Sequence, residues 1–205
     1  TAFLSSIGFR LLLIDNRGVG FSSLESFSMR PHSISSMAED ALACIQDCEW
    51  TEFHLIGVSM GGMISERLAL MVAEGSASVR IKSLVLITTH CRSNLSTLPS
   101  FGALTDLILL LATGGGGPLT DKHTGEVKAD HPMLRMLFPK KYRHENKEAI
   151  VEAFARIERE ELPYDVIDEY KKVPQTTPGD ALKQIIGLLD HSVGEEGIEK
   201  LTSSN

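Results

Sequence analysis

The sequence predicts an α/β fold: a parallel sheet flanked by helices, with a helical cap inserted after the sheet strands. Three apolar segments of strand length, 9–15, 53–58 and 82–88, are separated by segments with helical periodicity. This alternation is typical of a parallel sheet with helices on its faces. After Thr89 the pattern changes to helical segments alone, which indicates the cap.

The composition is that of a globular chain with one sizeable core. The 205 residues are 42% hydrophobic and 23% charged, and the net charge is -7. An acidic chain lacks the concentrated basic surface that phosphate groups require, so we expect no nucleic-acid partner. The longest apolar run, Leu107–Ala112, is far too short for a transmembrane segment.

The cysteines predict free thiols. Cys44, Cys48 and Cys91 are too few for a disulfide framework or a structural zinc site. Free thiols suit a reducing compartment, and the first residues do not resemble a signal peptide. We therefore expect a cytoplasmic protein.

The first strand and helix follow from apolar patterning. Phe9–Asp15 is a continuous apolar run between glycine-containing turns, which predicts a strand buried on both faces. A helix is predicted to begin at Ser35 or Ser36, either of which could cap it. The positions expected on its buried face are Met37, Ala38, Ala41, Leu42 and Ile45.

The remaining core elements are a strand over Phe53–Val58, a helix over Met60–Val72 and a strand over Lys82–Thr88. In the cap, helices are predicted over about Phe101–Ala112, His144–Glu161 and Asp180–His191. The stretch Thr113–Pro132 contains four consecutive glycines and is predicted to be a loop. It lacks the Lys-Ser/Thr pair of a phosphate-binding loop.

The motif that indicates chemistry is Gly57-Val58-Ser59-Met60-Gly61, which matches G-x-S-x-G between a predicted strand and a predicted helix. In a sharp turn of this kind, Gly57 and Gly61 would give the backbone room, and Ser59 would project its hydroxyl above the carboxyl ends of the strands. The N–H of Met60, at the helix N-terminus, would donate to an oxyanion. The alternative is a plain turn, because glycine and serine are common.

A second motif, D-x-R-G-x-G-x-S over Asp15–Ser22, directly follows the first predicted strand. With both motifs in this order, the sequence resembles the α/β-hydrolase superfamily of serine hydrolases. The resemblance implies a partial core with the family's strands 4 to 6 at residues 1–92, a cap at 93–190, and the start of the return to the core at 191–205. We interpret Asp15 and Arg17 as loop-shaping or ion-pairing residues.

The resemblance also implies that part of the site is missing. The family's acid and histidine follow later strands, and its oxyanion loop precedes the fourth strand, so all three would lie outside this chain. The family's third strand, which lies between the strands at 9–15 and 53–58, would also be missing. We therefore expect a partial sequence with poor stability and little turnover on its own.

None of the seven histidines has the family's placement. His90 follows the last predicted strand at its carboxyl end, so we interpret it as a possible pocket residue. The others are interpreted as packed, surface, loop or helix-end residues: His32, His54, His123, His131, His144 and His191.

The function expected for the complete protein is a serine hydrolase. It would act on a small-molecule acyl substrate, such as an ester, through an acyl-enzyme on Ser59, with the triad completed outside this chain. No metal or organic cofactor is implied. The alternatives are a non-catalytic α/β-hydrolase-like binding protein and an inactive truncated fragment.

Overall fold

The computed structural model divides into two compact units, Thr1–Ser23 with Pro99–Ala181 and Leu24–Leu98 with Leu182–Asn205. The structure describes residues 2–22, 32–91, 101–112, 119, 121, 124, 126, 128–153, 178–189 and 191–203. The predicted domain boundaries at 92/93 and 190/191 remain a prediction.

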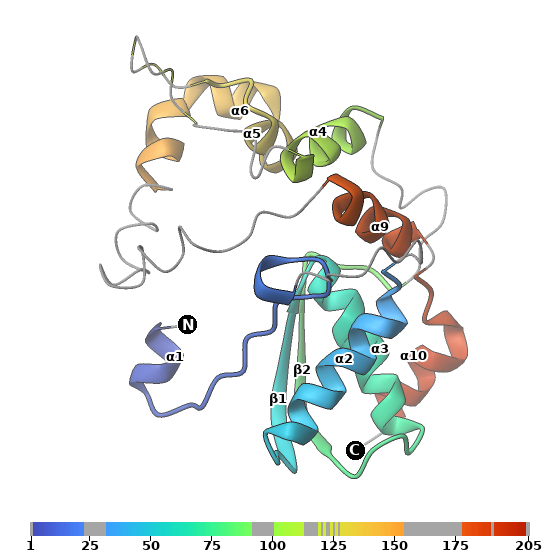
Figure 1. The fold of residues 1–205 in the computed structure, drawn as a ribbon. Helices are drawn as coiled ribbons and strands as arrows, with labels where there is room; N and C mark the ends of the chain where they lie inside the picture. The colour runs from blue at the N-terminus through green and yellow to red at the C-terminus, as the bar shows by residue number, and fades with distance from the viewer. Residues whose placement is uncertain are drawn as a thin grey trace. The chain divides into compact units, whose positions relative to one another are not determined.

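The second unit contains a two-stranded parallel sheet, β1 (Glu52–Val58) beside β2 (Arg80–Ile87), with Val58 paired to Ile87 at the carboxyl end. Helix α3 (Met60–Ala73) connects the strands and packs on both. Helix α2 (Ile34–Asp47) lies beside α3, as Figure 1 shows. The strand–helix–strand prediction for this part of the chain is confirmed, with β2 beginning and ending earlier than expected.

Helix α2 begins at Ile34, so the predicted cap at Ser35 or Ser36 is wrong. Ser33 has extended backbone angles and its hydroxyl accepts from the N–H of Ser36 at 3.1 Å, which makes it the N-cap. The predicted buried positions are confirmed, and Ile34 joins them. The buried apolar side chains of α2 are those of Ile34, Met37, Ala38, Ala41, Leu42 and Ile45.

The amino-terminal end of the sheet is bordered by charged side chains. Glu52 receives hydrogen bonds from Arg80 at 2.7 Å and from Lys82 at 3.0 Å, and these two cations lower the pKa of Glu52 to about 2. Next along the ladder, His54 Nδ1 lies 2.7 Å from Ser83 Oγ on the sheet surface. His54 is therefore exposed at the sheet surface, one of the two placements expected from its position in the strand.

The segment predicted as the first strand, Phe9–Asp15, is not part of a strand. Phe9, Leu11 and Leu13 are 50%, 39% and 74% exposed, respectively, instead of buried. A strand requires a ladder with a neighbour, and within the described residues β1 and β2 pair only with each other. An apolar run alone therefore did not determine strand structure here.

Among the described residues of the first unit, the regular elements are helical. The unit contains α1 (Ala2–Ser6), a 3-10 turn η1 (Gly20–Ser22), α4 (Phe101–Ala112), α5 (Pro132–Leu137) and α6 (Lys140–Glu145). The prediction for α4 is confirmed. Between α4 and α5, Arg135 donates two hydrogen bonds to Asp106, one of them from Nε to Oδ2 at 2.9 Å. Leu134, the residue before Arg135 on α5, is fully buried.

Other predictions for this region need correction. The helix expected over His144–Glu161 is interrupted: α6 ends at Glu145, Asn146 follows, and residues 147–153 are helical again. Residues 154–161 and the four glycines lie outside the described residues. The predicted loop ends at His131, whose Nδ1 accepts from Met133 N–H at 3.2 Å and caps α5.

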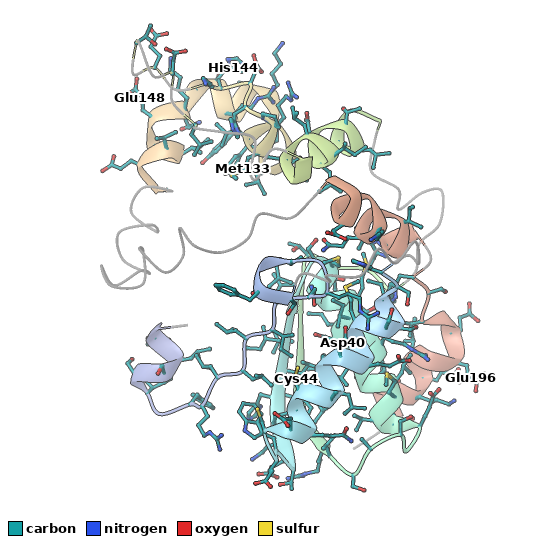
Figure 2. All side chains as sticks on the ribbon, viewed as in Figure 1. Asp40, Cys44, Met133, His144, Glu148 and Glu196 are labelled. Atoms are coloured by element: carbon teal, nitrogen blue, oxygen red, sulfur yellow. The ribbon has the colours of Figure 1, made fainter. Side chains whose placement is uncertain are left out.

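The chain returns to the second unit through α9 (Pro178–Leu189), predicted as Asp180–His191, and continues into α10 (Gly194–Ser203), which was not predicted. Within that unit α9 approaches the start of α2 closely, because a Cβ on Gly187 would lie 2.0 Å from the carbonyl oxygen of His32. Helix α10 packs on α3, and Figure 2 shows Glu196 on this helix.

The cysteines are free thiols, as predicted, and all three are half-buried. Figure 2 shows Cys44 on α2. Across the described ranges, no helix is both long and apolar enough to cross a membrane. No group of three or more His, Cys, Asp or Glu side chains there could hold a metal ion.

Candidate active site

Ser59 lies at the junction between β1 and α3, where the backbone takes an unusual conformation. Its φ of 52° and ψ of -121° are rare for a residue with a side chain. Its N–H donates to the carbonyl of Ile87 on β2 at 2.9 Å, and its own carbonyl accepts from Gly62 at 2.9 Å. Both backbone groups are therefore used to hold a sharp turn between strand and helix.

Ser59 is an exposed residue, and its hydroxyl is not used to cap α3. The side chain of a serine at an N-cap usually accepts a hydrogen bond from an N–H in the first helical turn. The Ser59 side chain makes no such hydrogen bond. It sits at the helix N-terminus, where backbone N–H groups without intrahelical partners favour negative charge. The N–H of Met60, the first residue of α3, is one of these groups.

The two glycines of the motif differ in what they contribute. A Cβ on Gly57 would lie 2.4 Å from the carbonyl oxygen of Gly61 and 2.5 Å from Ser65 Oγ, so Gly57 permits strand and helix to approach. A Cβ on Gly61 would meet nothing within 4 Å. The expectation that both glycines relieve a clash is therefore met at Gly57 but not at Gly61.

Sequence reasoning missed Thr88 and Thr89, which follow β2. Thr88 has a φ of 49°, and a positive φ is a genuine outlier for a β-branched residue. Thr89 lies against Gly62, where an added Cβ would be 2.5 Å from Thr89 Cβ. Val58 and Ile87 are paired at the carboxyl ends of the two strands. The residues that follow them, Ser59 and Thr88, therefore lie at neighbouring strand ends, and both have a positive φ. The sequence signal for the contact between Gly62 and Thr89 is the glycine itself, which leaves room for the threonine side chain.

His90 is half-buried and its ring lies 6.4 Å from that of His191, tilted by 43°. Its Nδ1 is buried without a hydrogen-bond partner among the described residues. Within the same residues no histidine or carboxylate hydrogen-bonds to Ser59 Oγ. The role of His90 as a pocket residue therefore stays a prediction.

Three side chains, those of Glu66, His191 and Cys91, form a polar group that sequence reasoning also missed; we call it the Glu66 cluster. Glu66 and His191 are buried and Cys91 is half-buried. Glu66 on α3 is fully buried, with one carboxylate oxygen 3.0 Å from His191 Nε2 and the other 3.5 Å from Cys91 Sγ. Burial and the neighbouring Glu66 raise the pKa of the Cys91 thiol. His191 is thus a buried partner of α3, not only a helix-end residue.

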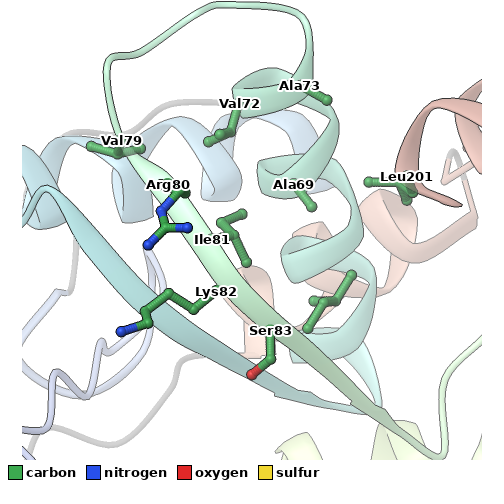
Figure 3. Close-up of a pocket in the computed structure, with 10 residues that line it drawn as sticks. Ala69, Val72, Ala73, Val79, Arg80, Ile81, Lys82, Ser83 and Leu201 are labelled. Atoms are coloured by element: carbon green, nitrogen blue, oxygen red, sulfur yellow. The ribbon is translucent and has the colours of Figure 1, made fainter. Parts of the chain in front are cut away.

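A cavity of about 350 Å³ lies at the other end of the same elements (Figure 3). It is lined by the last part of α3, the first part of β2 and Leu201 of α10. Ser59 stands at the beginning of α3 and beside the last residues of β2. The cavity is therefore not the candidate active site.

The remaining histidines differ in their burial. His32 and His131 are buried, His144 is exposed beside Asp130, and His123 lies outside the described residues.

In the second motif, Asp15 shapes its loop by accepting a hydrogen bond from Phe21 N–H at 3.2 Å. Gly18 and Gly20 have positive φ angles of 78° and 53°, which residues with a side chain rarely adopt.

Comparison with known proteins identifies the family. A family model of the alpha/beta hydrolase fold matches residues 2–112, more than half of the chain. The chain belongs to the alpha/beta hydrolase fold family.

Two curated relatives are similar over a shorter stretch. Rhodomycin D methylesterase DauP of Streptomyces sp. (strain C5) and Rhodomycin D methylesterase DnrP of Streptomyces peucetius are each 32% identical to this chain over 71 residues. Each match covers 35% of this chain and 24% of the relative. The matched stretch thus spans about a quarter of the length of either methylesterase.

Proposed function

We propose that the complete protein is a serine hydrolase that cleaves an ester of a small molecule through an acyl-enzyme on Ser59. The observation that supports this most directly is the strained, exposed Ser59 at the strand–helix junction, with its hydroxyl outside the helix cap. The family and the two methylesterases support ester chemistry. Residues 93–190 would form the cap.

In the proposed reaction Ser59 Oγ attacks the acyl carbonyl, and the alcohol part of the ester leaves with a proton. Water then hydrolyses the acyl-enzyme and releases the acid. The N–H of Met60 would stabilise the oxyanion, since it lies at the positive end of α3. Serine needs a base to accept its proton, so we propose that a histidine and an acid outside this chain complete the triad.

A fluorophosphonate probe tests the nucleophile directly, because it reacts with activated serines and leaves a stable adduct. We expect the complete protein to be labelled at Ser59, with labelling abolished in Ser59→Ala. Ser65→Ala is the matched control: Ser65 lies on the same helix, and its hydroxyl donates to the carbonyl of Gly61 at 2.8 Å. Labelling should survive in that variant.

The alternative, a non-catalytic binding protein, predicts the opposite result. If the folded complete protein gives no adduct at Ser59 and hydrolyses no ester, the serine hydrolase proposal is wrong. The chain of 205 residues alone should hydrolyse esters slowly or not at all. Rapid turnover by this chain would show that the missing catalytic groups are within it.

A further inference from the structure

We infer that Glu66 and His191 are positioning residues of the proposed active site. Glu66, on the helix that begins directly after Ser59, bonds both His191 and Cys91, and this cluster holds the segment after β2 against that helix. This inference rests on the proposed role of Ser59. It assigns a function to a pair that lies within one unit of the structure but 125 residues apart in the sequence.

The pair is built as a fully satisfied polar contact. The side chains of His191 and Glu66 are 3% and 1% exposed. An ionised carboxylate can only accept hydrogen bonds, so His191 Nε2 carries the proton of their contact when Glu66 is charged. Cys91 donates to the second oxygen. Each carboxylate oxygen therefore has a donor, as a buried carboxylate requires.

Glu66 lies in a row of residues on one face of α3, spaced by one helical turn. Gly62 meets Thr89, Glu66 meets His191 and Cys91, and Leu70 approaches Gly197 of α10. At the end of the row, Glu74 lies 3.5 Å from Lys200. The segment from His191 to Lys200 thus runs beside the second half of α3. Among these contacts, the buried polar one is that between Glu66 and His191.

The row begins beside the strained turn. The segment Thr88–Cys91 is held at one end by the bond between Ser59 N–H and Ile87, and at the other end by Glu66. The carbonyl of Cys91 also accepts from Val193 N–H at 2.8 Å, two residues after His191. Strained backbone persists only where its surroundings determine it. One of these contacts is made by Ser59 itself, and the others fix the chain three residues after Thr88.

The first test looks for the buried hydrogen bond in the wild-type protein and uses one variant to assign it. Nitrogen NMR of the complete protein should show one histidine with a proton on Nε2 that exchanges slowly with water, and the signal should be lost in His191→Gln. If no imidazole N–H is protected from exchange, the buried contact does not exist in solution and the inference is wrong.

The second test measures hydrogen exchange by mass spectrometry. We expect His191→Ala to increase exchange at least about tenfold in peptides covering 59–66 and 88–91, with α2 unchanged. His191→Gln should restore protection, since its amide can donate to Glu66. His54→Ala is the control, because His54 is an exposed histidine in the same unit. Unchanged exchange in folded His191→Ala would overturn the inference.

The third test connects the pair to Ser59. We expect His191→Ala to slow fluorophosphonate labelling of Ser59 by about tenfold or more, because small displacements of a nucleophile are costly, and His191→Gln to recover most of the rate. Wild-type labelling rates in both variants would refute the positioning role. If the wild type itself is not labelled, the proposed function fails, whereas the exchange and NMR results still decide whether the pair holds the turn.

Discussion

At the scale of single residues, the candidate site depends on the positive φ angles of Ser59 and Thr88 and on the close approach of Gly57 to the carbonyl of Gly61. Ser59 and Thr88 both adopt conformations that cost free energy, of the order of 1–3 kcal/mol each. The strain is local to the carboxyl ends of β1 and β2, where Ser59 is exposed. Functional sites commonly contain such strain, because it presents a side chain that regular structure would bury or cap.

The glycines of the motif give a matched pair of substitutions. Gly57→Ala should lower the free energy of unfolding by about 1–3 kcal/mol, since its Cβ would overlap the carbonyl of Gly61. Gly61→Ala should be neutral or stabilise by up to about 1 kcal/mol, because it has space and favours the helix. Urea unfolding of both variants measures this. Equal changes in the free energy of unfolding in the two variants would show that a side chain at position 57 does not disturb the contact between β1 and α3.

The pKa of Cys91 predicts its reactivity. Burial and Glu66 raise this pKa, and the thiolate is the reactive form, so alkylation by iodoacetamide should rise at higher pH than for an ordinary cysteine. Rates for each cysteine can be followed by mass spectrometry from pH 7 to 10. Glu66→Gln removes one cause of the shift and should move the Cys91 profile to lower pH. A profile that Glu66→Gln leaves in place would contradict the assigned cause.

At the scale of elements, α4 and α5 are joined by a charge pair whose contribution depends on pH. Arg135 lowers the pKa of Asp106 below its ordinary value of 3.8. The folded state therefore binds the proton less tightly than the unfolded state. The stabilisation is fully present above pH 3.8 and is lost as the pH falls through the lower, folded value.

Replacing Asp106 should reveal this dependence. Asp106→Asn is expected to destabilise the protein at pH 7 by only about 1 kcal/mol, because Arg135 is 40% exposed and partly screened by water. The difference from wild type should shrink toward pH 2. Thermal unfolding followed by circular dichroism checks it, with Asp130→Asn as a control at a more exposed pair. A difference that persists unchanged at pH 2 would contradict the charge mechanism.

At the scale of the whole molecule, the sheet presents apolar side chains to solvent. Ile56 is paired with Val85 and Val58 with Ile87, and these four side chains are 42–55% exposed. Parallel sheets are commonly covered on both faces, and contiguous exposed apolar side chains promote association. The second unit is therefore expected to be prone to self-association through this face.

A double substitution tests this expectation. Ile56→Thr with Val85→Thr should reduce the binding of an apolar fluorescent dye and the fraction of oligomer seen by light scattering, without changing the circular dichroism spectrum. Leu13→Thr is the control, because Leu13 is 74% exposed but lies outside the sheet. If the control reduces dye binding as much as the double variant does, the sheet face is not responsible.

Sequence reasoning succeeded where the signal is local. The apolar periodicity of α2, the two strands and the first turn of α3 depend on residues close together in the chain, and these elements were predicted within a few residues. It failed for Phe9–Asp15, where an apolar run was taken as a strand without evidence of a neighbour. It also missed α10, a short helix that is polar on average, although its apolar residues lie on one face.

The sequence by itself determined the family, the order of β1, α3 and β2, and the place of Ser59 between strand and helix. These follow from spacing, periodicity and short motifs. Only the tertiary structure decided that Gly62 receives Thr89, that Glu66 bonds His191, and that Gly57 rather than Gly61 permits the close approach. Such contacts join residues far apart in the chain, and their free energy exists only once packing has excluded water and brought donors to acceptors.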